Sequence, residues 1–201
     1  KSITIFLEKQ LKVKVNPDKS KVGSPLRLKF LGFSLGVDRN GAYARPAKES
    51  QKRVKQALKQ ITKRNRGISI ARMCAEINRK MRGWLQYYSI GKLTGFVRRL
   101  DQWLRTRIRQ YIWKQWKKLK TKLTNLRRLG LSYRDAYTFA STRKGYWRTA
   151  HSKTLNYSLT NRKLERLGLM NMSKTLQSIQ KVIKLSNRRI RIRTYGGVRG
   201  R

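Results

Sequence analysis

Residues 94–119 carry a strong helical pattern that limits how the rest of the chain can fold. At 3.6 residues per turn, their apolar side chains share one broad face: Phe96, Leu100, Trp103, Leu104, Ile108, Tyr111 and Ile112. The opposite face collects Arg98, Arg105, Arg109, Trp113 and Trp116. We therefore expect one long helix that packs into a core on one side. Its other side offers guanidinium groups and two large rings, an arrangement suited to binding a polyanion.

Net charge identifies the expected partner. The chain has 52 Lys and Arg against 8 Asp and Glu, a net charge of +44 that internal salt bridges cannot neutralise. Such charge repels itself and destabilises the compact state unless an anionic partner screens it. Nucleic acid fits this requirement. A membrane surface is the rival partner, and we reject it because no lipidation motif is present and the predicted helices have core faces.

Periodicity predicts a mainly α-helical fold with a small α+β segment at its start. Residues 1–45 should form a helix over 1–11, strands over 11–15 and 27–37, a hairpin turn at 38–41 and a return strand. A three-helix bundle follows over 46–119, with Ser69 capping its second helix and Gly91 ending it. Short helices fill a basic region over 120–201, whose Arg-rich tail at 187–201 should be flexible without a ligand.

Cations at helical spacing are the candidate binding residues. One stripe of the predicted helix at 46–64 carries Lys48, Lys52, Lys55, Lys59 and Lys63, and we favour phosphate contact over a merely solvated face. A basic loop at 141–148 adds Arg143, Lys144, Tyr146 and Arg148. Arg98, Arg105 and Arg109 complete the set.

The aromatic residues have structural interpretations of their own. We expect core packing for Trp84, Tyr88, Trp103 and Tyr111. For Trp113 and Trp116, packing against the region after residue 119 is favoured over base stacking. For Tyr146 and Trp147, nucleic-acid contact and local packing stay equally open.

The sequence contains no complete set of catalytic residues. The eight carboxylates are scattered and form no pair suited to a two-metal site, and no Walker loop or nucleophile motif occurs. One cysteine, Cys74, and one histidine, His151, exclude an internal disulfide and a Cys-rich or multi-histidine metal site. No apolar run approaches the length of a bilayer span, and no signal peptide is visible. We expect an intracellular protein without a bound cofactor, and, since Lys1 is no initiator, part of a longer chain.

Several stretches together resemble one family, the group II intron-encoded reverse transcriptases, also called maturases. The resemblance covers about residues 11–170 and rests on the order of its motifs. These are Asn16-Pro-Asp-Lys19-Ser20-Lys21, Phe30-Leu31-Gly32-Phe33, Arg45-Pro46, Arg82-Gly83-Trp84 with Tyr87-Tyr88, Leu100-Asp101 with Trp103, Arg105 and Arg107, Trp113-Lys114 with Trp116-Lys117, and Lys144-Gly145-Tyr146-Trp147 with the later Asn161 and Leu167-Gly168-Leu169.

The resemblance implies three parts. Residues 1–45 would be the end of a polymerase palm, with Lys19 near the incoming nucleotide and Phe30, Leu31, Gly32 and Phe33 as the primer grip. Residues 46–119 would be the maturase-specific or thumb domain, which binds intron RNA in splicing and template–primer duplex in copying. Residues 120–201 would help to bind RNA and a DNA target.

The resemblance also sets limits. The family's catalytic Tyr-x-Asp-Asp motif is not in this chain, so Mg²⁺ is expected only at that polymerase site and in the intron RNA. The partners implied are group II intron RNA, target DNA or an RNA–DNA duplex, and an upstream polymerase portion, in a bacterial cytoplasm or an organellar matrix.

Proteins with two other functions would carry a similar net charge. A general structured-RNA-binding or ribosomal-type protein would bind any structured RNA equally. A DNA-binding module of a transposase or integrase would prefer duplex DNA, and we predict against that preference.

Overall fold

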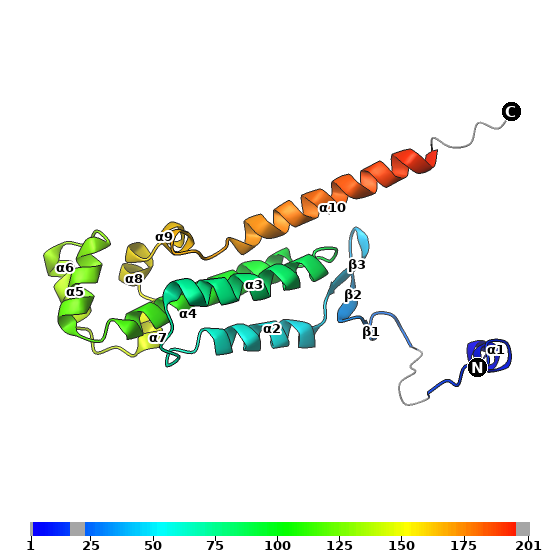
Figure 1. Cartoon of the computed structure of the whole chain (residues 1–201), viewed down its shortest axis with the longest axis horizontal. Coiled ribbons are helices and arrows are strands. Elements are labelled where there is room, and N and C mark those ends of the chain that lie inside the picture. The colour runs from blue at the N-terminus through cyan, green and yellow to red at the C-terminus, as the bar shows by residue number, and fades with distance from the viewer. Residues whose placement is uncertain (1, 17–22, 196–201) are drawn as a thin grey trace.

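The computed structural model describes residues 2–16 and 23–195 of the chain, and within them the fold is mainly helical (Figure 1). The elements are α1 (Ser2–Lys9), β1 (Lys29–Phe30), β2 (Phe33–Asp38), β3 (Gly41–Pro46), α2 (Lys48–Ile61), α3 (Ile70–Tyr88), α4 (Thr94–Gln115), α5 (Leu119–Arg128), α6 (Tyr133–Ala140), α7 (Tyr146–Ala150), α8 (Lys153–Ser158), α9 (Asn161–Arg166) and α10 (Met172–Tyr195). This confirms the predicted fold class. None of the described helices is both long and apolar enough to cross a membrane.

The small sheet is antiparallel, with its strands in the order β1-β2-β3. Its second hairpin confirms the predicted turn at 38–41. Asp38 pairs with Gly41, the Asn40 amide donates to Asp38 Oδ1 at 2.9 Å, and Gly41 has φ +106°. Only glycine adopts such a φ without strain, which is why the turn ends there.

Two strand predictions in this segment were wrong. The strand expected over 27–37 is split by a tight turn at Leu31 and Gly32, which have φ +48° and +77°. Residues 11–15 form no strand, because no strand within the described part of the chain pairs with them, and the Val13 amide donates instead to the Leu7 carbonyl. Alternating side chains indicate a strand only where another strand satisfies the backbone.

The bundle predicted over 46–119 is present as α2, α3 and α4. Each helix buries one apolar stripe, represented by Leu58, Ile77 and Leu104, which are all fully buried. The Ser69 hydroxyl accepts from the Arg72 amide at 3.2 Å and caps α3 as predicted.

A fourth helix, α10, completes the bundle, and the sequence did not predict this placement. In Figure 1 it lies along α3 and α4 on the side opposite α2, and its C-terminal part extends past them. Met172 and Leu176 are buried in the shared core, and Gln180 donates to the Ser89 carbonyl at 3.0 Å.

Several predicted boundaries needed correction. The helix from residue 94 ends at Gln115 rather than at 119, because Trp116 has ψ +68° and leaves the helical path. Gly91 is not the residue that ends α3, which stops at Tyr88. Gly91 instead allows a close approach, since a Cβ there would lie 2.9 Å from the Ala44 carbonyl oxygen of β3. The expected flexible tail is helical as far as Tyr195, and residues 196–201 lie outside the described part.

The segments after residue 119 pack on the end of α4. Trp113 is buried, and its ring lies 5.2 Å from the Phe139 ring of α6 and 5.9 Å from the Trp116 ring. This confirms the predicted packing role of Trp113. Buried residues from α2 to α10 form one cluster, so the division at residue 119 stays a prediction about function.

Candidate nucleic-acid interface

The lysine stripe of α2 is exposed and free of ion pairs. Because α2 ends at Ile61 rather than at the predicted residue 64, Lys63 lies just past the helix. All five candidates, Lys48, Lys52, Lys55, Lys59 and Lys63, lie on the solvent side, and none pairs with a carboxylate in the described part of the chain. The acid of α2, Glu49, is already bound by Lys29 at 2.6 Å, and this hydrogen bond lowers the pKa of Glu49. The stripe therefore keeps its full positive charge for an outside partner.

A tryptophan of α4 lies opposite this stripe. The Trp103 ring is half-buried, and its centroid lies 5.2 Å from Lys55 Nζ and 5.4 Å from Arg107 Cζ. Arg107 also donates to Thr62 Oγ1 at 2.7 Å and to the Lys59 carbonyl at 3.2 Å. The ring and these bonds hold the cations in place. They therefore lose less side-chain freedom when a ligand binds.

A second ring with two cations lies at the far end of α4. The Tyr146 centroid lies 5.1 Å from Arg64 Cζ and 5.3 Å from Lys114 Nζ. Tyr146 and Trp147 begin α7 rather than forming the predicted loop, because Gly145 starts a short helix there. The Tyr146 ring therefore packs locally against cations, and its contact with nucleic acid stays a prediction.

Two separate hollows and the cations beside them lie along α2 and α4, and we call this surface the α2–α4 groove. One part, of about 390 Å³, is lined by Lys55, Lys59, Trp103, Arg107, Gln110 and Trp147. A second part, of about 360 Å³ near β3, includes Arg45, Lys48 and Arg99. Arg99 and Lys114 lie about 22 Å apart along α4, at 1.5 Å per residue. A row of cations of this length suits an extended anion rather than a small one.

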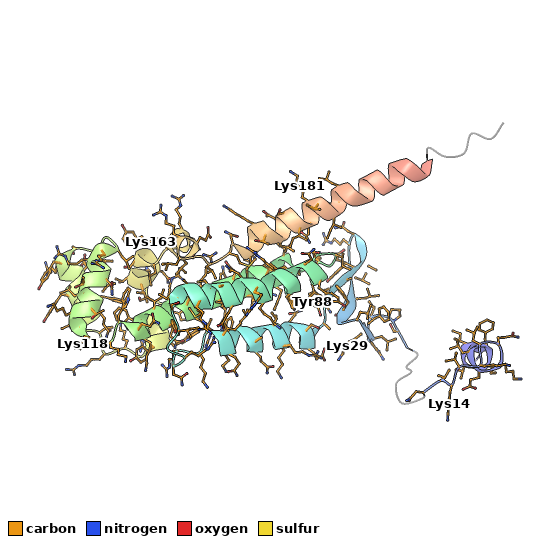
Figure 2. The ribbon with its side chains drawn as sticks, in the orientation of Figure 1. Lys14, Lys29, Tyr88, Lys118, Lys163 and Lys181 are labelled. Atoms are coloured by element: carbon orange, nitrogen blue, oxygen red, sulfur yellow. The ribbon has the colours of Figure 1, made fainter. Side chains whose placement is uncertain are left out.

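Other predicted residues lie outside this groove. Arg98 is exposed, but it is turned about 100° round the helix from Arg99. Lys144 and Arg148 line a separate open hollow of about 1350 Å³ among α6, α7 and α8, and Arg143 is exposed nearby. Figure 2 shows how cationic side chains project from most sides of the protein, including Lys29, Lys118 and Lys181.

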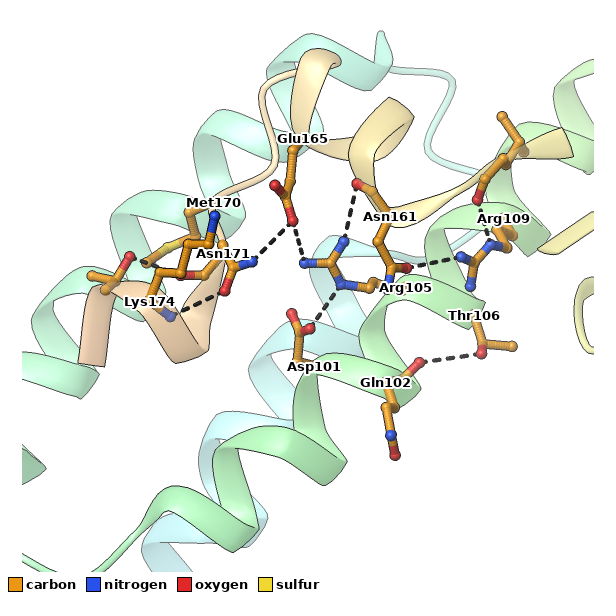
Figure 3. A network of polar contacts seen from close by, with 12 residues as sticks. Asp101, Gln102, Arg105, Thr106, Arg109, Asn161, Glu165, Met170, Asn171 and Lys174 are labelled. Carbon is orange, nitrogen blue, oxygen red and sulfur yellow. Dashed lines mark hydrogen bonds and ion pairs between the residues drawn. The ribbon is translucent and has the colours of Figure 1, made fainter. Parts of the chain in front are cut away.

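The expectation that Arg105 is exposed was wrong. It is 3 % exposed and donates to Asp101 Oδ2 at 2.7 Å, Glu165 Oε1 at 3.1 Å and the Asn161 carbonyl at 3.2 Å (Figure 3). Burial raises the pKa of Asp101 more than Arg105 lowers it. The guanidinium joins α4 to α9 and is not available to RNA.

The expectation that Arg109 is exposed was also wrong. It is 6 % exposed and donates to the Leu159 carbonyl at 2.9 Å and to Asn161 Oδ1 at 3.1 Å (Figure 3). No carboxylate of the described residues bonds to it, and burial lowers its pKa. A helical wheel showed a polar face, but it could not show that polar groups some 50 residues later cover that face.

The segment predicted as a primer grip lies against α3. Phe33 stacks on Tyr87 with ring centroids 5.6 Å apart, and the Tyr87 hydroxyl donates to the Leu31 carbonyl at 2.8 Å. Phe30 and Leu31 are exposed at the tip, and Gly32 lies close to the α3 residue Tyr88. Contact of this tip with a primer stays a prediction, and Lys19 lies outside the described residues.

Sequence reasoning missed four cations that complete the groove: Arg64, Arg99, Arg107 and Lys114. Arg99, Trp103 and Arg107 repeat at intervals of four along α4, so a signal for one shared stripe was present. Trp103 packs against the core as expected, but its half-exposed ring also contacts cations, which the sequence analysis did not consider.

The described residues contain no group of three or more His, Cys, Asp or Glu side chains that could hold a metal ion. No curated protein matches the chain. Residues 51–130 match the family described as group II intron, maturase-specific domain. The matched segment runs from the first turns of α2 through α5, and so includes most of both walls of the α2–α4 groove. This chain therefore contains a group II intron maturase-specific domain.

Proposed function

We propose that the chain binds group II intron RNA through the α2–α4 groove and thereby promotes splicing. One observation carries this proposal: the α2 lysines have no carboxylate partners among the described residues. They face Arg107, which lies against the Trp103 ring within the matched domain. Group II intron RNA is the partner that this domain implies.

The protein's contribution to splicing is electrostatic. Folded RNA brings phosphates close together, and cations held at fixed positions stabilise that arrangement by neutralising them. Backbone contacts of this kind read shape rather than sequence. Catalytic carboxylates are not needed in this role, because the intron RNA supplies the chemistry.

A finer part of the proposal concerns intron mobility. We propose that α2–α4 also serve as the thumb of an RNA-directed DNA polymerase that acts in retrohoming, with the tip at Phe30 and Leu31 facing the primer. The sheet's docking on α3 supports this, since Tyr87 joins it to the bundle. Target DNA, an RNA–DNA duplex and an upstream polymerase portion are the proposed partners. The hollow beside Lys144 and Arg148 would contact RNA or DNA.

The test replaces Lys52, Lys55 and Lys59 together by Gln and measures binding to a folded group II intron RNA. The logarithmic slope of affinity against salt should become shallower by roughly 0.9 for each phosphate that the variant no longer neutralises. The control replaces Lys120, Lys174 and Lys181, exposed lysines outside the groove, by Gln. Because both variants remove the same charge, a difference between them reports local binding at the groove.

Equal weakening of binding in the two variants would show that net charge alone drives binding and would refute the groove. Competition distinguishes the rival functions. Equal binding to unrelated structured RNA would support the general RNA-binding alternative. A preference for duplex DNA over RNA would support the transposase-type alternative.

A further inference from the structure

Gly83 occupies a position where the fold itself does not require glycine. It lies exposed in the interior of α3, and a Cβ built there has no neighbour within 4 Å. Its φ is not positive, unlike that of Gly32. Glycine in a helix interior is less stable than alanine. Neither space nor backbone conformation therefore accounts for this residue.

The surroundings of Gly83 form a groove between α2 and α3. Its volume is about 610 Å³, and it is lined by Ile61, Glu76, Arg79, Lys80, Gly83, Trp84, Tyr87 and Tyr88. None of these residues lines the α2–α4 groove. The missing side chain leaves the helix backbone bare in the middle of this surface.

Charge identifies the kind of ligand. Arg79, Lys80 and Arg82 are exposed beside Gly83. The carboxylate of the groove, Glu76, is held by Arg66 at 2.8 Å, and this bond keeps the pKa of Glu76 below its ordinary value. The rim therefore attracts anions, while Trp84 and the half-exposed Tyr87 provide apolar walls for sugars.

We propose that a second segment of nucleic-acid backbone crosses α3 at Gly83, where the absent side chain allows close approach. Arg79 and Lys80 contact the phosphates, and the sugars lie against Trp84. This inference rests on the proposed function, because it takes nucleic acid as the ligand, but it uses a groove of its own. The lysine helix α2 then lies between two bound segments of RNA.

The experiment compares Gly83→Ala and Gly83→Leu with Ala75→Leu in the full 201-residue chain. Ala75 is exposed on the same helix and does not line the groove. Gly83→Ala should raise the Tm by about 2–4 °C, because alanine favours the helix and nothing obstructs it. Gly83→Leu should weaken binding to folded group II intron RNA at least about tenfold, the effect of losing one charge-assisted hydrogen bond to phosphate. Ala75→Leu should leave affinity unchanged.

Two results would overturn the inference. A lower Tm in Gly83→Ala would show that the glycine is structural. Unchanged RNA affinity in Gly83→Leu would show that this surface is unused or serves a protein partner. If Gly83→Leu binds normally while the Lys52, Lys55 and Lys59 variant does not, the inference alone fails. If the unaltered chain shows no preference for intron RNA, the proposed function itself fails.

Discussion

Replacing Arg105 by Ala should destabilise the fold rather than weaken RNA contact directly. The side chain is 3 % exposed and bonds to Asp101 and Glu165 at 2.7 and 3.1 Å. Removing one partner of a buried ion pair costs about 3–5 kcal/mol, because the remaining charge is left without compensation. Glu165 is 32 % exposed and regains some water, so the low end of that range, about 3 kcal/mol, is expected.

Urea unfolding followed by circular dichroism measures this destabilisation directly. Arg98→Ala is the matched control, since Arg98 is an exposed arginine of the same helix and should change stability by less than about 0.5 kcal/mol. RNA affinity is measured under conditions where both variants remain folded. A destabilisation below about 1 kcal/mol, combined with abolished RNA binding in Arg105→Ala, would refute the argument, because surface substitutions have effects of that size.

Three further predictions test the core and its polar network. Because burial raises the folded-state pKa of Asp101 above its ordinary 3.8, its contribution to stability is present at low pH and lost as pH rises through the folded value. Asp101→Asn should therefore gain stability relative to the unaltered chain as the pH rises above 3.8, measured by urea unfolding at each pH; the opposite trend would contradict the burial argument. Gly91→Ala should cost about 1–3 kcal/mol, because its Cβ would press on the Ala44 carbonyl; an unchanged Tm would show that β3 can move aside. Trp113→Ala should cost about 3–5 kcal/mol and increase hydrogen exchange in α6, since its ring packs on Phe139; unchanged exchange in α6 would show that another contact anchors that helix.

Local signals in the sequence were sufficient for the helices of the bundle and for one hairpin. Apolar stripes predicted α2, α3 and α4, and Ser69 marked where α3 begins, because a cap bonds to an amide three residues away. The turn ending at Gly41 was likewise predicted from residues that are neighbours along the chain, at 38–41. Such interactions join neighbours along the chain, so residue order alone reveals them.

The candidate site was predicted only in part. The lysines of α2 were identified from their spacing, and they do form one wall of the α2–α4 groove. The other wall was missed, because Trp103 was placed in the core and the cations that its ring holds come from two different helices. The spacing of Trp103 and Arg107 along α4 did indicate a shared stripe, but the contact of the ring with Lys55 joins two helices and shows in the periodicity of neither.

The sequence by itself determined the charge, the helical periodicity and the motif order that resembles maturases. Only the tertiary structure decided which arginines are exposed. By helical spacing, Arg105 and Arg109 belong to the same polar stripe as exposed residues. In the structure they bond to Glu165 and Asn161, which lie 60 and 52 positions later in the sequence, and they are buried. A buried guanidinium is stable only where hydrogen-bond acceptors surround it. Here the packing of α9 on α4 supplies those acceptors. On the α2 side of the bundle, by contrast, the lysines are exposed.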